Sequence, residues 1–269
     1  MNRITERFRD LRAKGKKGFV VYIGGGDPNL AATEALALGF DRIGVDVLEI
    51  GVPFSDPLAD GLVNQLSAQR GLEAGTNPPK LLETVRAIRL HSQLPIVFYV
   101  YFNLLHRYGI ERFIVDCAKA GVDGLLVLDL PPEEAGNYES LMASAGLAVI
   151  YLVAPTTPDD RIELIVKRAS GFIYYVSREG VTGMQQKVAS NIGDMTGKIR
   201  KHTDLPIAVG FGISNPAQAK EVAMSAEAVV VGSAIVNQIA AAGKTVSIPD
   251  LVAKVEAFVK PMVDAVKNL

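Results

Sequence analysis

Residues 47–61 read VLEIGVPFSDPLADG, a short apolar run followed by a loop that proline and glycine interrupt. Side chains alternate along a strand, so Glu49 is expected to share one face with Val47 and Gly51, while Leu48 and Ile50 take the other face. A buried strand that ends in such a loop is typical of the repeating unit of a parallel α/β fold.

Seven similar runs, rich in β-branched and aromatic residues, are found along the chain. With the first, they cover residues 18–23, 47–50, 95–101, 124–128, 148–153, 171–176, 206–210 and 228–231. Helical patterning lies between them, for example at residues 80–90, 110–120, 132–145, 159–169 and 216–224. Eight strand–helix units in a chain of this length predict an α/β fold, a single (β/α)8 TIM barrel domain over residues 1–269.

An extra helix is expected before the first strand. Ile4, Phe8 and Leu11 follow one another at helical spacing, and this apolar face is predicted to close the barrel floor.

Residues 88–96 (IRLHSQLPI) and 199–207 (IRKHTDLPI) form a small internal repeat. Each copy is predicted to end a helix and to start a strand, on the face of the barrel away from the usual active site. His91 and His202 are therefore interpreted as helix C-terminal residues that the helix dipole favours.

Composition excludes several classes of protein. The net charge is -1 and there are no basic blocks, which argues against binding to nucleic acid or to an anionic membrane surface. No uncharged apolar run reaches the ~18 residues that a membrane span needs, and the N-terminus lacks an apolar signal core. The single cysteine, Cys117, reads as a small buried hydrophobe in a reducing compartment. The expected location is the cytoplasm.

Glu49 is the most informative single residue, because a charge inside an apolar strand costs several kcal/mol unless it is paired or used in chemistry. The alternative is a structural pair with Lys or Arg, but no predicted strand supplies one. The absence of a strand lysine also argues against Schiff-base chemistry, and the scattered histidines suggest no metal site. Acid–base chemistry by carboxylates remains.

The loops after the last three strands are rich in glycine, serine and threonine. Barrels commonly bind a phosphate at this place, so Gly212, Gly232 and Ser233 are predicted to form a phosphate cradle that Gly183 closes. The alternative is that these glycines only make tight turns.

Four tyrosines at strand positions either line the pocket or belong to the core. They are Tyr22, Tyr99, Tyr101 and Tyr174.

Several motifs together resemble one family, the tryptophan synthase α subunits. They are GDP at 26–28, LEIGVPFSDPLADG at 48–61, DLP at 129–131, GFIYYVS at 171–177, GVTG at 180–183, GFGIS at 210–214 and GSAIV at 232–236. The second motif is highly specific, and the match runs through the whole chain.

The resemblance implies a lyase of tryptophan biosynthesis that cleaves indole-3-glycerol phosphate, by a retro-aldol reaction, to indole and glyceraldehyde 3-phosphate. It implies Glu49 as the catalytic acid and base, and Asp60 as a second essential carboxylate that stabilises charge on the indole N–H. It implies no cofactor in this chain, and a pyridoxal-phosphate-dependent β subunit as partner, in an α2β2 tetramer.

The substrate pocket that the resemblance implies contains residues from most of the strand ends. The candidate residues are Tyr22, Tyr101, Leu126, Tyr174, Thr182, Gly183, Phe211, Gly212, Gly232 and Ser233.

The chain departs from the family pattern in three places: Leu62-Val63 replaces Pro-Thr, residues 24–26 are all glycine where Thr-Ala-Gly is usual, and Glu179 replaces a small residue. Two alternative functions stay open. One is a stand-alone lyase that releases free indole; the other is a weakly catalytic subunit that activates its partner. The presence of both carboxylates argues against the second.

Overall fold

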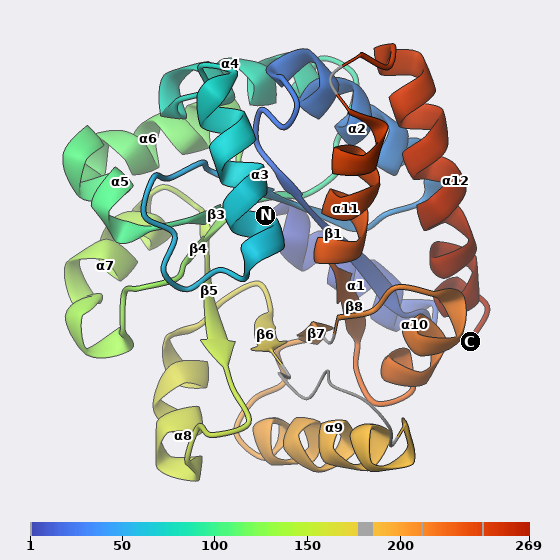
Figure 1. Cartoon of the computed structure of the whole chain (residues 1–269). Coiled ribbons are helices and arrows are strands. Elements are labelled where there is room, and N and C mark those ends of the chain that lie inside the picture. The colour runs from blue at the N-terminus through green and yellow to red at the C-terminus, as the bar shows by residue number, and fades with distance from the viewer. Residues whose placement is uncertain (1, 177–184, 211, 244) are drawn as a thin grey trace.

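The computed structural model describes residues 2–176, 185–210, 212–243 and 245–269. In these residues, eight parallel strands pair in sequence order and close into a barrel, with β1 against β8. Helices surround the strands (Figure 1), which confirms the predicted (β/α)8 barrel. The strands are β1 (Gly18–Gly24), β2 (Val47–Gly51), β3 (Ile96–Val100), β4 (Gly124–Val127), β5 (Ala148–Val153), β6 (Ile173–Val176), β7 (Ile207–Gly210) and β8 (Ala228–Val231).

The helices fill the connections between these strands. They are α1 (Arg3–Ala13), α2 (Leu30–Ile43), α3 (Leu62–Glu73), α4 (Pro78–Arg89), α5 (Phe102–Tyr108), α6 (Ile110–Ala120), the 3₁₀ turn η1 (Pro132–Glu134), α7 (Gly136–Ser144), α8 (Asp159–Arg168), α9 (Gln185–Arg200), α10 (Pro216–Ala223), α11 (Ser233–Ala242) and α12 (Ile248–Lys267). Asparagine caps start several of them: the side chains of Asn29, Asn77 and Asn215 accept the N–H groups of the first turns of α2, α4 and α10.

The alternation expected for residues 47–51 is confirmed. Leu48 and Ile50 belong to the outer core, between the strands and the helices, whereas Val47 belongs to a second cluster inside the barrel. The inward side chains of this inner cluster come from the strands or from directly beside them, among them Val20, Val47, Val97, Leu126, Ile150, Phe172, Ala208 and Val230.

Helix α1 closes the floor of the barrel, as predicted, and lies behind the strands in Figure 1. Ile4, Phe8 and Leu11 are buried in the inner cluster, where the rings of Phe8 and Phe172 are 5.7 Å apart. The inside of the barrel at the floor is therefore filled with apolar side chains.

At the floor, a side chain just before each even-numbered strand accepts an N–H from the start of the strand before it. Asp46 accepts from Phe19, Asp123 from Ile96, Ser170 from Val149 and Glu227 from Ile207, at 2.7, 2.8, 2.8 and 3.0 Å. Each acceptor satisfies a main-chain donor where a strand begins, so the barrel carries the same cap four times.

The internal repeat builds two of these caps. Arg89 and Arg200, at equivalent places in the two copies, pair with Asp123 and Glu227, the acids that cap the repeat's final isoleucines. His91 follows the C-terminal end of α4, and His202 follows that of α9, as predicted. The repeat is therefore structural.

Cys117 is buried, as expected from the sequence. It lies in α6, fully covered, and burial raises the pKa of its thiol. Within the described ranges, no helix is both long and apolar enough to cross a membrane.

The boundaries of the predicted strands differ from the observed ones by no more than two residues. Residues 102–108, for which no helix was predicted, form helix α5. The predicted helix at 132–145 begins as the 3₁₀ turn η1 and continues as α7.

Candidate active site

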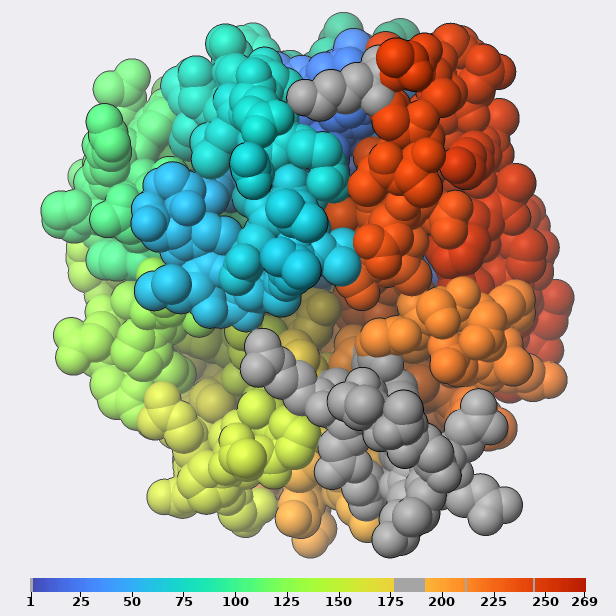
Figure 2. All heavy atoms as spheres, in the orientation of Figure 1, coloured from blue at the N-terminus to red at the C-terminus, as the bar shows by residue number. Residues whose placement is uncertain are grey.

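A cavity of about 460 Å³ opens at the end of the barrel where the strands finish. Its wall comes from the ends of β1, β3, β5, β6, β7 and β8 and from the start of α3. The lining residues include Tyr22, Asp60, Asn64, Tyr99, Leu128, Leu152, Tyr174, Gly210, Gly212, Val230, Gly232 and Ser233. In Figure 2 the segment of residues 52–73 (blue to cyan) stands at the rim of a hollow on this face.

Glu49 lies on β2, on the inward face, and is fully buried. Neither of its carboxyl oxygens has a hydrogen-bond partner among the described residues. Burial raises the pKa of Glu49 to about 8, because removal from water penalises the charged form. Because its carboxyl has no partner among the described residues and its pKa is raised, Glu49 is an uncharged acid at neutral pH rather than half of an ion pair.

Asp60 stands at the cavity wall, at the end of loop two (residues 51–61) and just before α3. Two phenols donate to its carboxylate. The hydroxyl of Tyr99 is 2.8 Å from Oδ1, and that of Tyr101 is 2.8 Å from Oδ2. The amide of Asn64 makes a longer contact with Oδ1, at 3.4 Å.

Tyr101 also holds loop two against the barrel. Its hydroxyl accepts the main-chain N–H of Ala59 at 3.0 Å, and its ring packs on Phe54 with the centroids 5.2 Å apart. On the other side, the side-chain amide of Gln65 donates to the carbonyl of Asp60 at 2.9 Å. The backbone around Asp60 is thus held both from Tyr101, the residue after β3, and from α3.

Loop one (residues 24–28) anchors α3. Asp27 is buried and accepts two hydrogen bonds from Arg70, at 2.8 and 2.7 Å, and one from Ser67 at 2.6 Å. A Cβ atom at Gly24 would lie 2.2 Å from Oγ of Ser67, and one at Gly26 would lie 1.8 Å from Oγ1 of Thr76. Gly24 and Gly26 therefore let the loop pack closely against α3 and the turn after it.

Tyr22 and Tyr174 line the cavity from β1 and β6. Burial is the main cause that raises the pKa of each phenol well above its ordinary value, and the nearby charges of Glu49 and Asp60 add to it. Both phenols therefore remain protonated in the working pH range, and both lie within electrostatic reach of the two acids.

Three of the four residues predicted to cradle a phosphate line the cavity together. Gly212 has φ +62 with open space around its Cβ position, Gly232 is the N-cap of α11, and Ser233 is the first residue of that helix. The first N–H groups of a helix have no partner within it, so this end of the cavity suits an anion.

Not every predicted site residue lies on the wall. Leu126 is fully buried in the inner cluster, whereas Leu128, the next inward residue of the same segment, lines the cavity. Thr182, Gly183 and Phe211 lie outside the described residues, as does Glu179.

Sequence reasoning did not assign a role to Asn64 or single out Tyr99 among the four tyrosines. Tyr99 lies on β3, two residues before Tyr101 and therefore on the same face, and this spacing could have indicated that both tyrosines reach the site.

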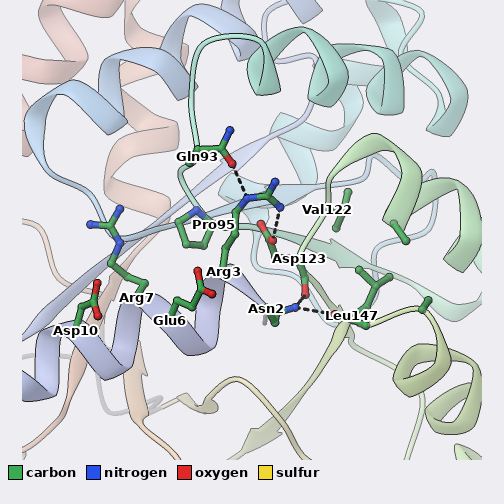
Figure 3. A pocket seen from close by; sticks show the side chains of 13 residues that line it. Asn2, Arg3, Glu6, Arg7, Asp10, Gln93, Pro95, Val122, Asp123 and Leu147 are labelled. Carbon is green, nitrogen blue, oxygen red and sulfur yellow. Dashed lines mark hydrogen bonds and ion pairs between the residues drawn. The ribbon is translucent and has the colours of Figure 1, made fainter.

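A second cavity, of about 820 Å³, lies at the barrel floor beside α1 (Figure 3). Several of its polar groups bind one another: Arg3 donates to Asp123 at 2.9 Å and to Gln93 at 2.8 Å, and Asn2 donates to the carbonyl of Asp123 at 2.6 Å. These contacts fasten α1 to the starts of the strands.

The comparison with known families decides the identity of the chain. A family model described as "Tryptophan synthase alpha chain" matches residues 8–267. The chain belongs to this family. It is 51% identical over 237 residues to the tryptophan synthase alpha chain of Opitutus terrae, covering 88% of this chain and 89% of that protein. It is 45% identical over 268 residues to that of Geobacter sulfurreducens, covering 100% of both chains.

Solved structures of the family have the same fold. The crystal structure of tryptophan synthase subunit alpha from Legionella pneumophila matches with a TM-score of 0.92 at 34% identity, covering 100% of both chains. A chain of tryptophan synthase from M. tuberculosis, in its aminoacrylate-bound form, matches with a TM-score of 0.87 at 28% identity, covering 99% of this chain and 100% of that chain.

Proposed function

We propose that the chain cleaves indole-3-glycerol phosphate to indole and glyceraldehyde 3-phosphate, with Glu49 as the acid and base and Asp60 as the second carboxylate. Membership of the tryptophan synthase alpha chain family supports the reaction. One observation carries the assignment of Glu49: it is fully buried in the barrel and neither oxygen has a partner in the described residues. Such a group is costly to fold and is kept for chemistry.

The reaction suits these two acids. A proton delivered to C3 of the indole ring turns the ring into a leaving group. The C3–C bond to the glycerol chain then breaks as the adjacent hydroxyl loses its proton and becomes the aldehyde. Glu49 is protonated at neutral pH, so it can give the first proton, and the carboxylate that results can take the second. Asp60 accepts the indole N–H and stabilises the positive charge that develops on the ring.

Glu49 does not line the cavity in this structure, although Tyr22 beside it does. Proton transfer needs hydrogen-bond distance, so a change of the Glu49 rotamer toward the substrate is part of the proposal.

The phosphate of the substrate occupies the end of the cavity formed by Gly212, Gly232 and Ser233. The glycines allow the main chain to approach the anion, and the N-terminus of α11 supplies donors and a favourable dipole. The apolar part of the cavity, with Leu128, Leu152 and the tyrosine rings, then takes the indole.

The partner is a β subunit that consumes the indole and holds the pyridoxal phosphate, in an α2β2 tetramer in the cytoplasm. Loop two and the start of α3 form the docking surface in this proposal. Leu58 is 91% exposed there and Leu62 is 69% exposed. Exposed leucines beside a catalytic acid are better suited to a protein interface than to water.

Release of indole by the purified chain, with and without a tryptophan synthase β subunit, tests this function. We expect slow release by the chain alone and substantially faster release with the β subunit. No cleavage of indole-3-glycerol phosphate under either condition would overturn the proposal.

A further inference from the structure

The two carboxylate oxygens of Asp60 are each held by a different phenol. Tyr99 donates to Oδ1 and Tyr101 donates to Oδ2, both at 2.8 Å. An ionised carboxylate only accepts hydrogen bonds and offers about four lone-pair sites, so two phenols leave room for further donors. Asp60 lines the cavity, where a substrate N–H can occupy one of the remaining sites.

Packing fixes the position of Tyr99 before any ligand arrives. Its Cα pairs with that of Gly51 in the ladder between β2 and β3. Its ring meets the ring of Tyr22 edge to face, with centroids 4.9 Å apart and planes at 66°. The phenol therefore projects from a rigid strand, whereas Asp60 itself lies on a loop.

The direction of the hydrogen bonds is also fixed. Burial raises the pKa of the Tyr99 phenol well above its ordinary value, and the charge of Asp60 raises it further. Burial is also the largest cause that raises the pKa of Tyr101, followed by its hydrogen bond to Asp60 and then by the charge of Asp60. Both phenols thus remain donors at every working pH, and each donates to the carboxylate of Asp60.

We propose that Tyr99 is a positioning residue for the proposed lyase reaction: its hydroxyl holds the Asp60 carboxylate so that a free lone pair faces the nitrogen of the indole ring. This inference rests on the proposed function. Tyr99 is better suited to a test than Tyr101, because Tyr101 also holds Ala59 and Phe54 of loop two.

The variant Tyr99→Phe removes the donor and keeps the ring against Tyr22. Because the held carboxylate acts when charge develops on the ring, we expect kcat for indole release to fall by about 10-fold or more while KM changes by less than about threefold. An unchanged kcat would contradict the inference.

Tyr151→Phe is the matched control. Tyr151 makes the same kind of bond, from its phenol to the carboxylate of Glu139 at 2.6 Å, but on the outer face of the barrel. We expect this control to keep kcat and KM. If Tyr151→Phe lowers kcat as much as Tyr99→Phe does, the effect comes from general loss of stability and the inference is wrong.

A double-mutant cycle with Asp60→Ala separates action through Asp60 from an independent role. We expect Tyr99→Phe to change kcat by less than about twofold in the Asp60→Ala background, since no carboxylate is left to hold. Additive losses would contradict the positioning role. Full activity of Asp60→Ala would instead overturn the role of Asp60 in the proposed function, which is a different outcome.

Discussion

Tyr22 and Glu49 are direct neighbours across the parallel ladder between β1 and β2. Tyr22 forms part of the cavity wall, and Glu49 is buried beside it. The charges of Asp60 and Glu49 both raise the pKa of the Tyr22 phenol, after burial. The barrel thus brings a carboxyl on β2, Glu49, and one at the end of loop two, Asp60, within electrostatic reach of one phenol.

The stability of the protein should depend on pH through Glu49. Burial raises its pKa in the folded state to about 8 from an ordinary value of 4.5, so the folded state binds the proton more tightly than the unfolded state. The stability that this proton contributes is fully present below pH 4.5 and is lost as the pH rises through 8. Urea unfolding at several pH values should show that the free energy of unfolding of the wild type falls as the pH rises through 8, whereas that of Glu49→Gln does not fall in this range. Parallel profiles of the two proteins would exclude the raised pKa.

A bulkier residue at Gly212 should weaken binding of glycerol phosphate far more than binding of indole, because a side chain there keeps the main chain from the anion. Gly15→Val is the control for Gly212→Val: both glycines have positive φ, +61 and +62, with nothing near the Cβ position, but Gly15 lies between α1 and β1. Calorimetric titration with each ligand measures the effect. Equal losses for both ligands would mean that Gly212 is only a turn residue.

A polar substitution on loop two should weaken the activation of indole release by the β subunit. We expect Leu58→Ser to reduce the activation of indole release by the partner and to leave the rate of the isolated chain nearly unchanged, because an exposed side chain contributes little until a partner covers it. Leu90→Ser is the control, since Leu90 is 78% exposed but follows α4 at the floor. Equal activation of all three proteins would place the docking surface elsewhere.

The floor caps should matter for stability rather than for turnover. Arg89 is 10% exposed and pairs with the buried Asp123, so Arg89→Met should lower the free energy of unfolding by about 3 kcal/mol. Arg86→Met, on the same helix, removes an exposed pair with Glu83 and should cost less than about 1 kcal/mol. Denaturant unfolding measures both. If both variants lower the free energy of unfolding by a similar small amount, the caps are not important for stability.

Strand periodicity was enough to predict the barrel, because each apolar run is bounded by turn residues and has one buried inward face. Helix α5 was not predicted, because its short segment contains polar residues and is followed by Gly109, which is typical of a loop. The contact of Tyr99 with Asp60 joins positions 39 residues apart, and no local pattern specifies it. The same holds for the repeated caps, which become visible only when the barrel closes.

The central claim is that Glu49 transfers the proton, and the rate of indole release by Glu49→Gln at saturating indole-3-glycerol phosphate, with the β subunit present, tests it most directly. We expect kcat to fall by about 10²–10⁴-fold, because glutamine is nearly isosteric but cannot give up and regain a proton at this site. Binding of glycerol phosphate to the same variant should remain within a few-fold of the wild type. Turnover by Glu49→Gln near that of the wild type would contradict the account.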